Sequence, residues 1–147
     1  MSTEDNKALT RTLLDRFNQK DLAVIDELYT PDFVLHDPAG PGGWPRGVND
    51  REEYKKYLSS FFAAMPGQFT IDDIIAEGDK VVTRWTYRST HQDQWRDVAA
   101  TGKEVTFTAT GISRFVDGKV EETWQNVDNL GVLLPSTTRQ SHPLAPT

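Results

Sequence analysis

The sequence predicts an α+β domain in which N-terminal helices pack on one face of a curved, mostly antiparallel sheet. Two patterns predict it: apolar residues recur with helical spacing up to about Met65, and they alternate with polar residues from Phe69 onward. A third observation is the dipeptide Asp117-Gly118, which supplies the positive φ angles of a tight hairpin turn between two alternating runs. The 147 residues are the size of one domain.

Three helices are expected before the sheet, over residues 3–19, 21–29 and 50–65. Asp21 is a good N-cap for the second helix, and Asn49 or Asp50 caps the third. The third helix carries a stripe of aromatic and aliphatic side chains, which we assign to the core because such stripes are usually buried. A brief strand at 33–37 and a loop rich in proline and glycine at 38–47 lie between the second and third helices.

Four longer strands are expected over residues 69–77, 80–91, 105–116 and 119–128. With the turn at Asp117-Gly118, regular pairing sets Phe115 opposite Val120 and Gly111 opposite Trp124. One face of this hairpin would then carry Gly111, Ser113, Phe115, Val120, Glu122, Trp124, Asn126 and Asp128. We assign residues 1–135 to the domain and residues 136–147, which are polar and contain proline, to an extended or disordered tail.

Composition excludes several function classes. The formal net charge of −6 argues against binding to nucleic acid, whose phosphates require a basic surface. The apolar runs are far too short to span a membrane, and the absence of cysteine and of an evident signal peptide predicts a cytoplasmic protein. Two histidines outside the tail do not make a metal site, and neither a GxSxG nor a GxGxxG motif occurs.

Five segments together resemble the SnoaL-like polyketide cyclases of the NTF2-like superfamily, and the similarity runs from about Leu9 to Leu134. They are YTPDFVLHDP (29–38), AEGDKVVTRWTYRSTH (76–91), ATGKEVTFTATG (100–111), RFVDGKVEETW (114–124) and VDNLGVLL (127–134). The resemblance implies a cone of helices on a curved sheet, a pocket inside the cone, no cofactor, a small hydrophobic substrate and a homodimer formed through the outer face of the sheet.

The resemblance also implies a catalytic residue. In these cyclases an aspartate near the end of the last strand is the general acid/base of an intramolecular aldol closure, and Asp128 occupies that position. A carboxylate in an apolar pocket loses hydration and can exchange protons near neutral pH. The alternative is that Asp128 ends the strand and caps the turn that follows. The family's pocket histidine has no counterpart on the preceding strand, so His36 or His91, each at a strand end, is expected to assist.

The pocket is expected to have aromatic walls and a few small or polar positions. The residues that we assign to it are Trp124, Trp44, Trp85, Tyr87, Phe107, Gly111, Ser113, Phe115 and Tyr54. Trp95, on a polar loop, is expected to be a lid or a subunit contact. The sequence therefore predicts an acid/base enzyme that acts on a carbonyl compound by aldol cyclisation, isomerisation or a related lyase or hydration step. The alternative is a non-catalytic domain that binds a small molecule.

Overall fold

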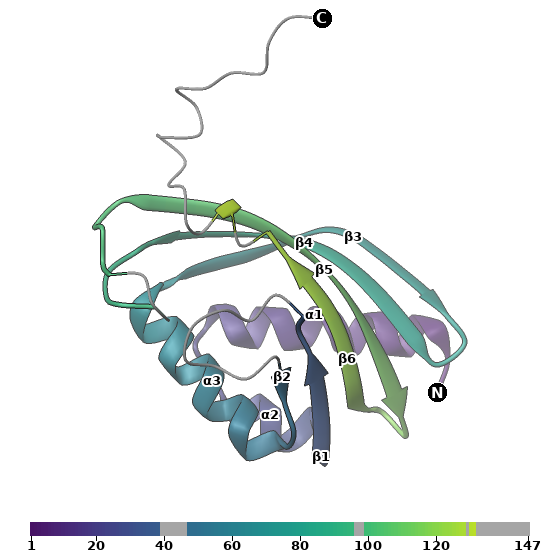
Figure 1. The fold of residues 1–147 in the computed structure, drawn as a ribbon. Helices are drawn as coiled ribbons and strands as arrows, with labels where there is room; N and C mark the ends of the chain where they lie inside the picture. Colours follow the sequence, from purple (N-terminus) through teal and green to yellow (C-terminus); the bar gives the residue numbers. More distant parts are fainter. Residues whose placement is uncertain (39–46, 96–98, 129, 132–147) are drawn as a thin grey trace, which may run out of the picture.

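One curved sheet of six strands, with helices against its inner face, makes up the fold (Figure 1). The computed structural model describes residues 1–38, 47–95, 99–128 and 130–131. The helices are α1 (Thr3–Asn18), α2 (Ala23–Leu28) and α3 (Arg51–Ala64). The strands are β1 (Tyr29–His36), β2 (Gly47–Val48), β3 (Gly67–Glu77), β4 (Lys80–Thr90), β5 (Glu104–Val116) and β6 (Lys119–Val127). The α+β prediction is confirmed. Trp44 and the predicted tail lie outside the described residues.

The strand order is β2-β1-β6-β5-β4-β3, and every neighbouring pair is antiparallel except β1 and β6, which are parallel. In Figure 1 the long strands β3 to β6 arch over α1, and α2 and α3 lie beneath the end of the arch beside β1. The sheet is open, because β2 and β3 at its two edges do not pair with each other. The concave inner face therefore surrounds the space that the helices close from below.

The predicted cap of α3 is confirmed, whereas α2 begins later than predicted, with Leu22 and not Asp21 at its N-cap position. At the start of α1, Ser2 and Asp5 form a capping box in which each side chain accepts a hydrogen bond from the other residue's backbone N–H. Asp50 caps α3 by accepting a hydrogen bond from the backbone of Glu53. At the start of α2, Asp21 accepts a hydrogen bond from the backbone N–H of Ala23. These contacts satisfy backbone donors that no preceding turn of helix can reach.

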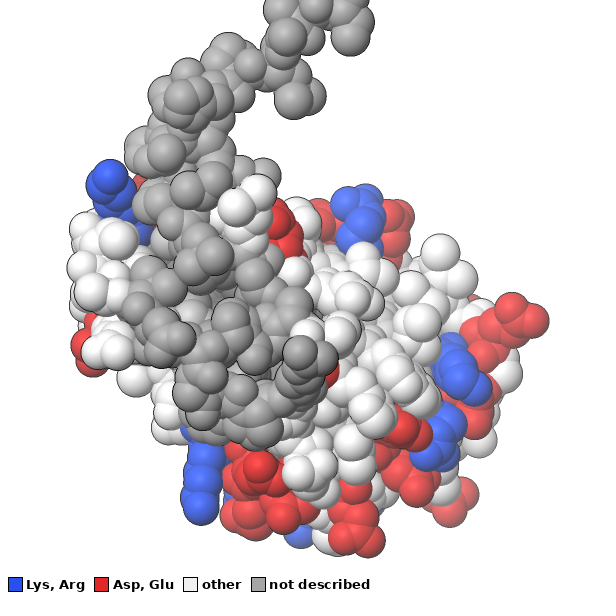
Figure 2. All heavy atoms as spheres, in the orientation of Figure 1, with Lys and Arg blue, Asp and Glu red and all other residues white. Residues whose placement is uncertain are grey.

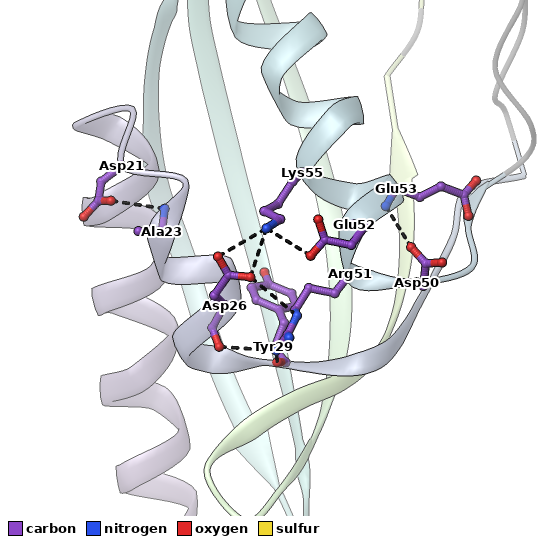
Figure 3. Close-up of polar contacts among 9 residues, drawn as sticks. All are labelled: Asp21, Ala23, Asp26, Tyr29, Asp50, Arg51, Glu52, Glu53 and Lys55. Carbon is purple, nitrogen blue, oxygen red and sulfur yellow. Dashed lines mark hydrogen bonds and ion pairs between the residues drawn. The ribbon is translucent and has the colours of Figure 1, made fainter.

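Ion pairs join α2 to α3 at the base of the cone (Figure 3). Lys55 of α3 lies 3.0 Å from the carboxylate of Asp26 on α2. Arg51 donates hydrogen bonds to the backbone carbonyls of Asp26 and Tyr29, where α2 ends and β1 begins. Arg51 therefore covers carbonyl groups that the end of α2 leaves without a helical partner.

β1 begins at Tyr29, four residues earlier than the predicted strand start at Phe33. Pro31 lies within this early part, and the register against β6 shifts between Tyr29 and Val34. Proline has no N–H to donate to a neighbouring strand, so within a sheet it occurs at edges and at irregular positions such as this one. The buried residues of β1 are Tyr29, Phe33 and Leu35, and Asp37 directly after the strand is buried too.

An aromatic core fills the space between α3 and the middle of the sheet. Phe61 lies 5.0 Å from Tyr87 and 6.3 Å from Phe107, measured between ring centres. Tyr87 is completely buried, and its hydroxyl donates a hydrogen bond to the carbonyl of Met65 at the end of α3. Within the described residues, no helix is both long and apolar enough to cross a membrane.

The predicted register of the last hairpin is right at the turn and wrong beyond it. Phe115 pairs with Val120, as predicted, but Arg114 pairs with Glu122, so that Glu121 is an extra residue in β6. This β-bulge moves every later residue of β6 to the opposite face. Gly111 therefore lies opposite Gln125, and Trp124 lies opposite Ile112 on the outer face.

Candidate functional site

A cavity of about 120 Å³ lies between the inner face of the sheet and helices α1 and α3. Its aromatic and aliphatic lining comes from both helices and from the middle strands. Of the residues that the sequence analysis assigned to a pocket, the lining includes Tyr54, Trp85, Phe107, Gly111, Ser113 and Phe115. It also includes residues that were not predicted: Thr10, Leu13, Leu14, Phe17, Tyr29, Asp37, Tyr57, Leu58, Phe61, Phe69, Thr83, Trp95, Thr123, Gln125 and Val127.

Strand pairing arranges the inner face in layers. Gly111 of β5 pairs with Thr83 of β4 on one side and with Gln125 of β6 on the other. On the far side of β6, Trp124 pairs with His36 of β1, so the next residue of each strand brings Asp37 beside Gln125. We call these four residues, Thr83, Gly111, Gln125 and Asp37, the polar layer. All four line the cavity.

The polar layer includes a buried carboxylate next to an amide. Asp37 is only 4% exposed, and the side-chain amide of Gln125 lies 3.5 Å from one of its carboxylate oxygens. In the next layer the hydroxyls of Ser113 and Thr123 form a hydrogen bond of 2.8 Å across β5 and β6. The sheet wall of the cavity thus presents a carboxylate, an amide and three hydroxyl groups, whereas most of the remaining lining is apolar.

Tyrosine hydroxyls form a second polar group, on the helix side of the cavity. Tyr29 and Tyr54 both line it, and their rings lie 5.2 Å apart. Burial raises the pKa of Tyr29 above its ordinary value, and a hydrogen bond with Tyr54 offsets this slightly. Burial also raises the pKa of Tyr54 well above the ordinary value. Both phenols therefore keep their protons at physiological pH, and because one donates to the other, one O–H group of the pair can donate to a ligand.

Asp128 does not belong to the cavity lining, although Val127 directly before it does. Its backbone N–H bonds to the carbonyl of Thr108, and its carboxylate accepts a hydrogen bond from the backbone of Gly131 at 3.0 Å. These contacts hold the end of β6 and the turn after it. They match the alternative that the sequence left open, in which Asp128 ends the strand and caps a turn.

The two predicted histidines lie apart from each other. His36 is on the outer face, where its ring stacks on Trp124 with ring centres 5.5 Å apart and its Nε2 lies 2.7 Å from a carboxylate oxygen of Glu122. That hydrogen bond is the largest influence on Glu122 and holds the pKa of its carboxyl below the ordinary value. His91 is buried, 1% exposed, and follows β4, with no hydrogen-bond partner for Nε2 among the described residues. Neither histidine lines the cavity.

The remaining aromatic predictions have different outcomes. Trp124 is 37% exposed on the outer face, because the bulge turns it away from the cavity. Tyr87 lies in the core next to the cavity and is not part of its lining. Trp95 is buried and packs against Tyr57 and Phe61, so it forms a cavity wall within its own subunit.

Asp37 and Gln125 supply the carboxylate and the amide of the polar layer, and sequence reasoning missed both. Asp37 was detectable, since Phe33, Leu35 and Asp37 alternate and so share one strand face. Gln125 was not, because the bulge decides which face it occupies. Among the described residues, no group of three or more acidic or histidine side chains is placed to hold a metal ion.

The comparisons with known proteins agree on the family. The sequence profile of the SnoaL-like polyketide cyclases matches residues 7–134. No curated protein matches the chain at a significant level. Solved structures do. IdmH, a candidate polyketide cyclase of Streptomyces antibioticus, is 34% identical with a TM-score of 0.75, and the alignment covers 87% of this chain and 95% of that one.

Two further structures match over almost the whole chain. AclR, a candidate hydroxylase of Streptomyces galilaeus, is 29% identical with a TM-score of 0.78, over 97% of this chain and 100% of that one. A candidate polyketide cyclase of Acidithiobacillus ferrooxidans is 28% identical with a TM-score of 0.75, again over 97% and 100%. With the profile match spanning most of the sequence and the same cone around a cavity, the chain belongs to the SnoaL-like polyketide cyclase family.

Proposed function

We propose that this protein is a cofactor-independent enzyme that moves a proton on a small hydrophobic carbonyl compound. The reaction class is aldol cyclisation, isomerisation or a related lyase or hydration step. The observation that carries the proposal is the cavity itself, because aromatic walls hold a flat apolar body while one wall presents a carboxylate, an amide and hydroxyl groups. The similarity to two candidate polyketide cyclases supports a carbonyl substrate.

The reaction needs a group that takes a proton from the carbon next to a carbonyl and later returns it. The family position assigns this role to Asp128, with His36 or His91 as its assistant, and both assignments stay predictions. The hydrogen-bonded pair of Tyr29 and Tyr54 would suit a second role, since one of its neutral hydroxyls can donate a hydrogen bond to an enolate oxygen.

The test uses 2-tetralone, a bicyclic ketone, in D₂O. We expect the wild-type protein to speed deuterium entry at the carbon between the carbonyl and the aromatic ring, followed by NMR. Asp128→Asn keeps the size of the side chain and removes its basicity. If Asp128 is the acid/base group, the variant should lose about 100-fold or more in exchange rate. An unchanged rate would remove Asp128 from the mechanism.

A non-catalytic binding domain is the second candidate, and one observation favours it: the carboxylate of Asp128 already accepts a hydrogen bond from Gly131. In that case 2-naphthol, which has the shape of the enol of 2-tetralone, should bind and quench the fluorescence of Trp85 and Trp95 in the cavity wall. Binding without any exchange above the buffer rate would favour this candidate.

We also infer that the outer face of β5 and β6 contacts a second copy of the chain. Ile112 and Trp124 pair there, each 37% exposed, next to threonine side chains. Figure 2 shows an area without charged side chains over these strands, with acidic and basic side chains around it. Sizing in solution tests this, because Ile112→Lys should shift a dimer toward the monomer.

A further inference from the structure

We infer that Asp37, and not Asp128, is the catalytic carboxylate, with Gln125 as its positioning residue and the space above Gly111 as the place of the reacting carbon. This inference rests on the proposed function, since it names the group that moves the proton. Three features of the polar layer support it: the burial of Asp37, its contact with Gln125 and the missing side chain at Gly111.

Among the residues that the structure describes, Asp37 is the only acidic residue that lines the cavity. The carboxylate comes from the end of β1, where backbone pairing with β6 fixes the preceding residue, His36, against Trp124. At 4% exposure it has little access to bulk water. A base that works inside a closed site needs both properties, because the bound ketone must meet it at close range and water must not compete.

Gln125 lies beside this carboxylate from the neighbouring strand. Its amide nitrogen is 3.5 Å from a carboxylate oxygen of Asp37, which is long for a hydrogen bond. A contact of this length is weak, so the approach of a ligand atom can tighten or replace it. Gln125 faces the cavity only because of the bulge at Glu121, which turns Trp124 outward.

Gly111 leaves room next to the pair. An added Cβ there would lie 3.8 Å from the Cβ of Gln125 and 3.7 Å from the carbonyl oxygen of Trp124, which are ordinary contact distances. The backbone angle φ of Gly111 is not among the positive ones, so strand geometry does not require glycine. The small residue is thus explained by the space it gives to a ligand between Thr83 and Gln125.

In the proposed step a proton passes from the substrate to Asp37 and later returns to the product. The carboxylate of Asp37 takes the proton from the carbon next to the carbonyl, and the bond electrons form the enolate of the substrate. In an aldol closure the enolate carbon then bonds to a second carbonyl carbon, whose oxygen becomes an alkoxide. That alkoxide takes the proton back from Asp37, which leaves the enzyme as it began.

Four proteins test the inference: the wild type, Asp37→Asn, Asp128→Asn and Asp32→Asn. Asp32 is an exposed carboxylate on β1, the strand that Asp37 directly follows, and it serves as the matched control. We expect Asp37→Asn to lower the rate of deuterium entry into 2-tetralone by about 100-fold or more. Binding of 2-naphthol should change by less than about threefold, and Asp32→Asn should match the wild type.

The outcomes separate this inference from the proposed function. Exchange that survives Asp37→Asn but not Asp128→Asn would overturn the inference and leave the proposed function in place. A wild-type rate no faster than buffer would overturn both. Should Asp37→Asn fail to fold, Gly111→Val provides the second test, because it fills the space beside an intact Asp37. A folded Gly111→Val protein with full exchange activity would overturn the inference.

Discussion

Enlarging Gly111 should stabilise the fold and weaken ligand binding, two effects of opposite sign from one substitution. Gly111 lies inside β5, paired on both sides, with an ordinary strand conformation. Glycine in a strand interior loses more conformational entropy on folding than alanine does, which costs about 0.5–1 kcal/mol. Because an added methyl group meets its neighbours at 3.7 Å or more, Gly111→Ala should recover most of that free energy.

The expected change in melting temperature follows from the length of the domain. A gain of about 1 kcal/mol raises the melting temperature of a domain of this length by about 2–4 °C. The same methyl group occupies the cavity next to Asp37 and Gln125. Because one methylene group in an apolar pocket changes recognition by about 10-fold or more, 2-naphthol should bind Gly111→Ala at least about 10-fold more weakly. Gly111→Val should extend the loss of affinity further.

The assays are thermal unfolding by circular dichroism and titration of tryptophan fluorescence with 2-naphthol. Thr110→Ala, on the exposed face of the same strand, is the matched control and should leave affinity unchanged. A lower melting temperature for Gly111→Ala would show that the backbone needs glycine after all. A higher melting temperature with unchanged affinity would show that the ligand does not use this space.

Two further predictions concern titration and the outer face. Burial keeps Tyr54 protonated in the folded state above its ordinary pKa of 10.0, whereas the unfolded chain loses that proton. Stability should therefore fall as pH rises above about 10, by about 1.4 kcal/mol per pH unit for this group. Tyr54→Phe should remove that part of the slope in urea unfolding, and an unaltered slope would contradict the burial argument. His36→Gln should cost less than about 1 kcal/mol, because the hydrogen bond between His36 and Glu122 lies at the surface. It should also leave exchange of 2-tetralone unchanged, and a large loss of rate would restore the predicted assisting role of His36.

Alternation predicted the inner face of β5 well, because every buried residue of that strand lies on the predicted side. Val105, Phe107, Ala109 and Phe115 are buried, as alternate positions facing a core require. Gly111 and Ser113 share that face and line the cavity. A long, regular, paired strand carries enough repeats for its faces to be assigned from sequence.

The same rule failed on β6 for a reason that lies outside its own residues. Arg114 binds the carboxylates of both Glu121 and Glu122, at 3.2 Å and 3.1 Å. Because Phe115 pairs with Val120 and Arg114 pairs with Glu122, Glu121 is an extra residue in β6, which is the definition of a bulge. No glycine or proline marks this position, so the run KVEETWQNV looks regular. The error moved Trp124 into the predicted pocket and Gln125 out of it.

The prediction of Asp128 as the catalytic residue depended on the same hairpin. Regular pairing would place Asp128 on the inner face with Trp124, which made it a natural pocket carboxylate. With the bulge, Thr123, Gln125 and Val127 take the inner positions. Asp37, in contrast, needed only the alternation of a short strand. It was passed over because the sequence alone does not show that β1 joins the sheet beside β6.

The parallel pairing of β1 with β6 also affects the order in which the protein folds. Asp37 and Gln125 are separated by 88 positions in the chain, and only this pairing brings them together. Closing so long a loop is entropically costly and slow, so such contacts form late in folding. During synthesis β6 must leave the ribosome before the polar layer can form. Ligand binding at that layer should therefore recover with the last phase of refolding, later than the helix signal, and would report on complete folding.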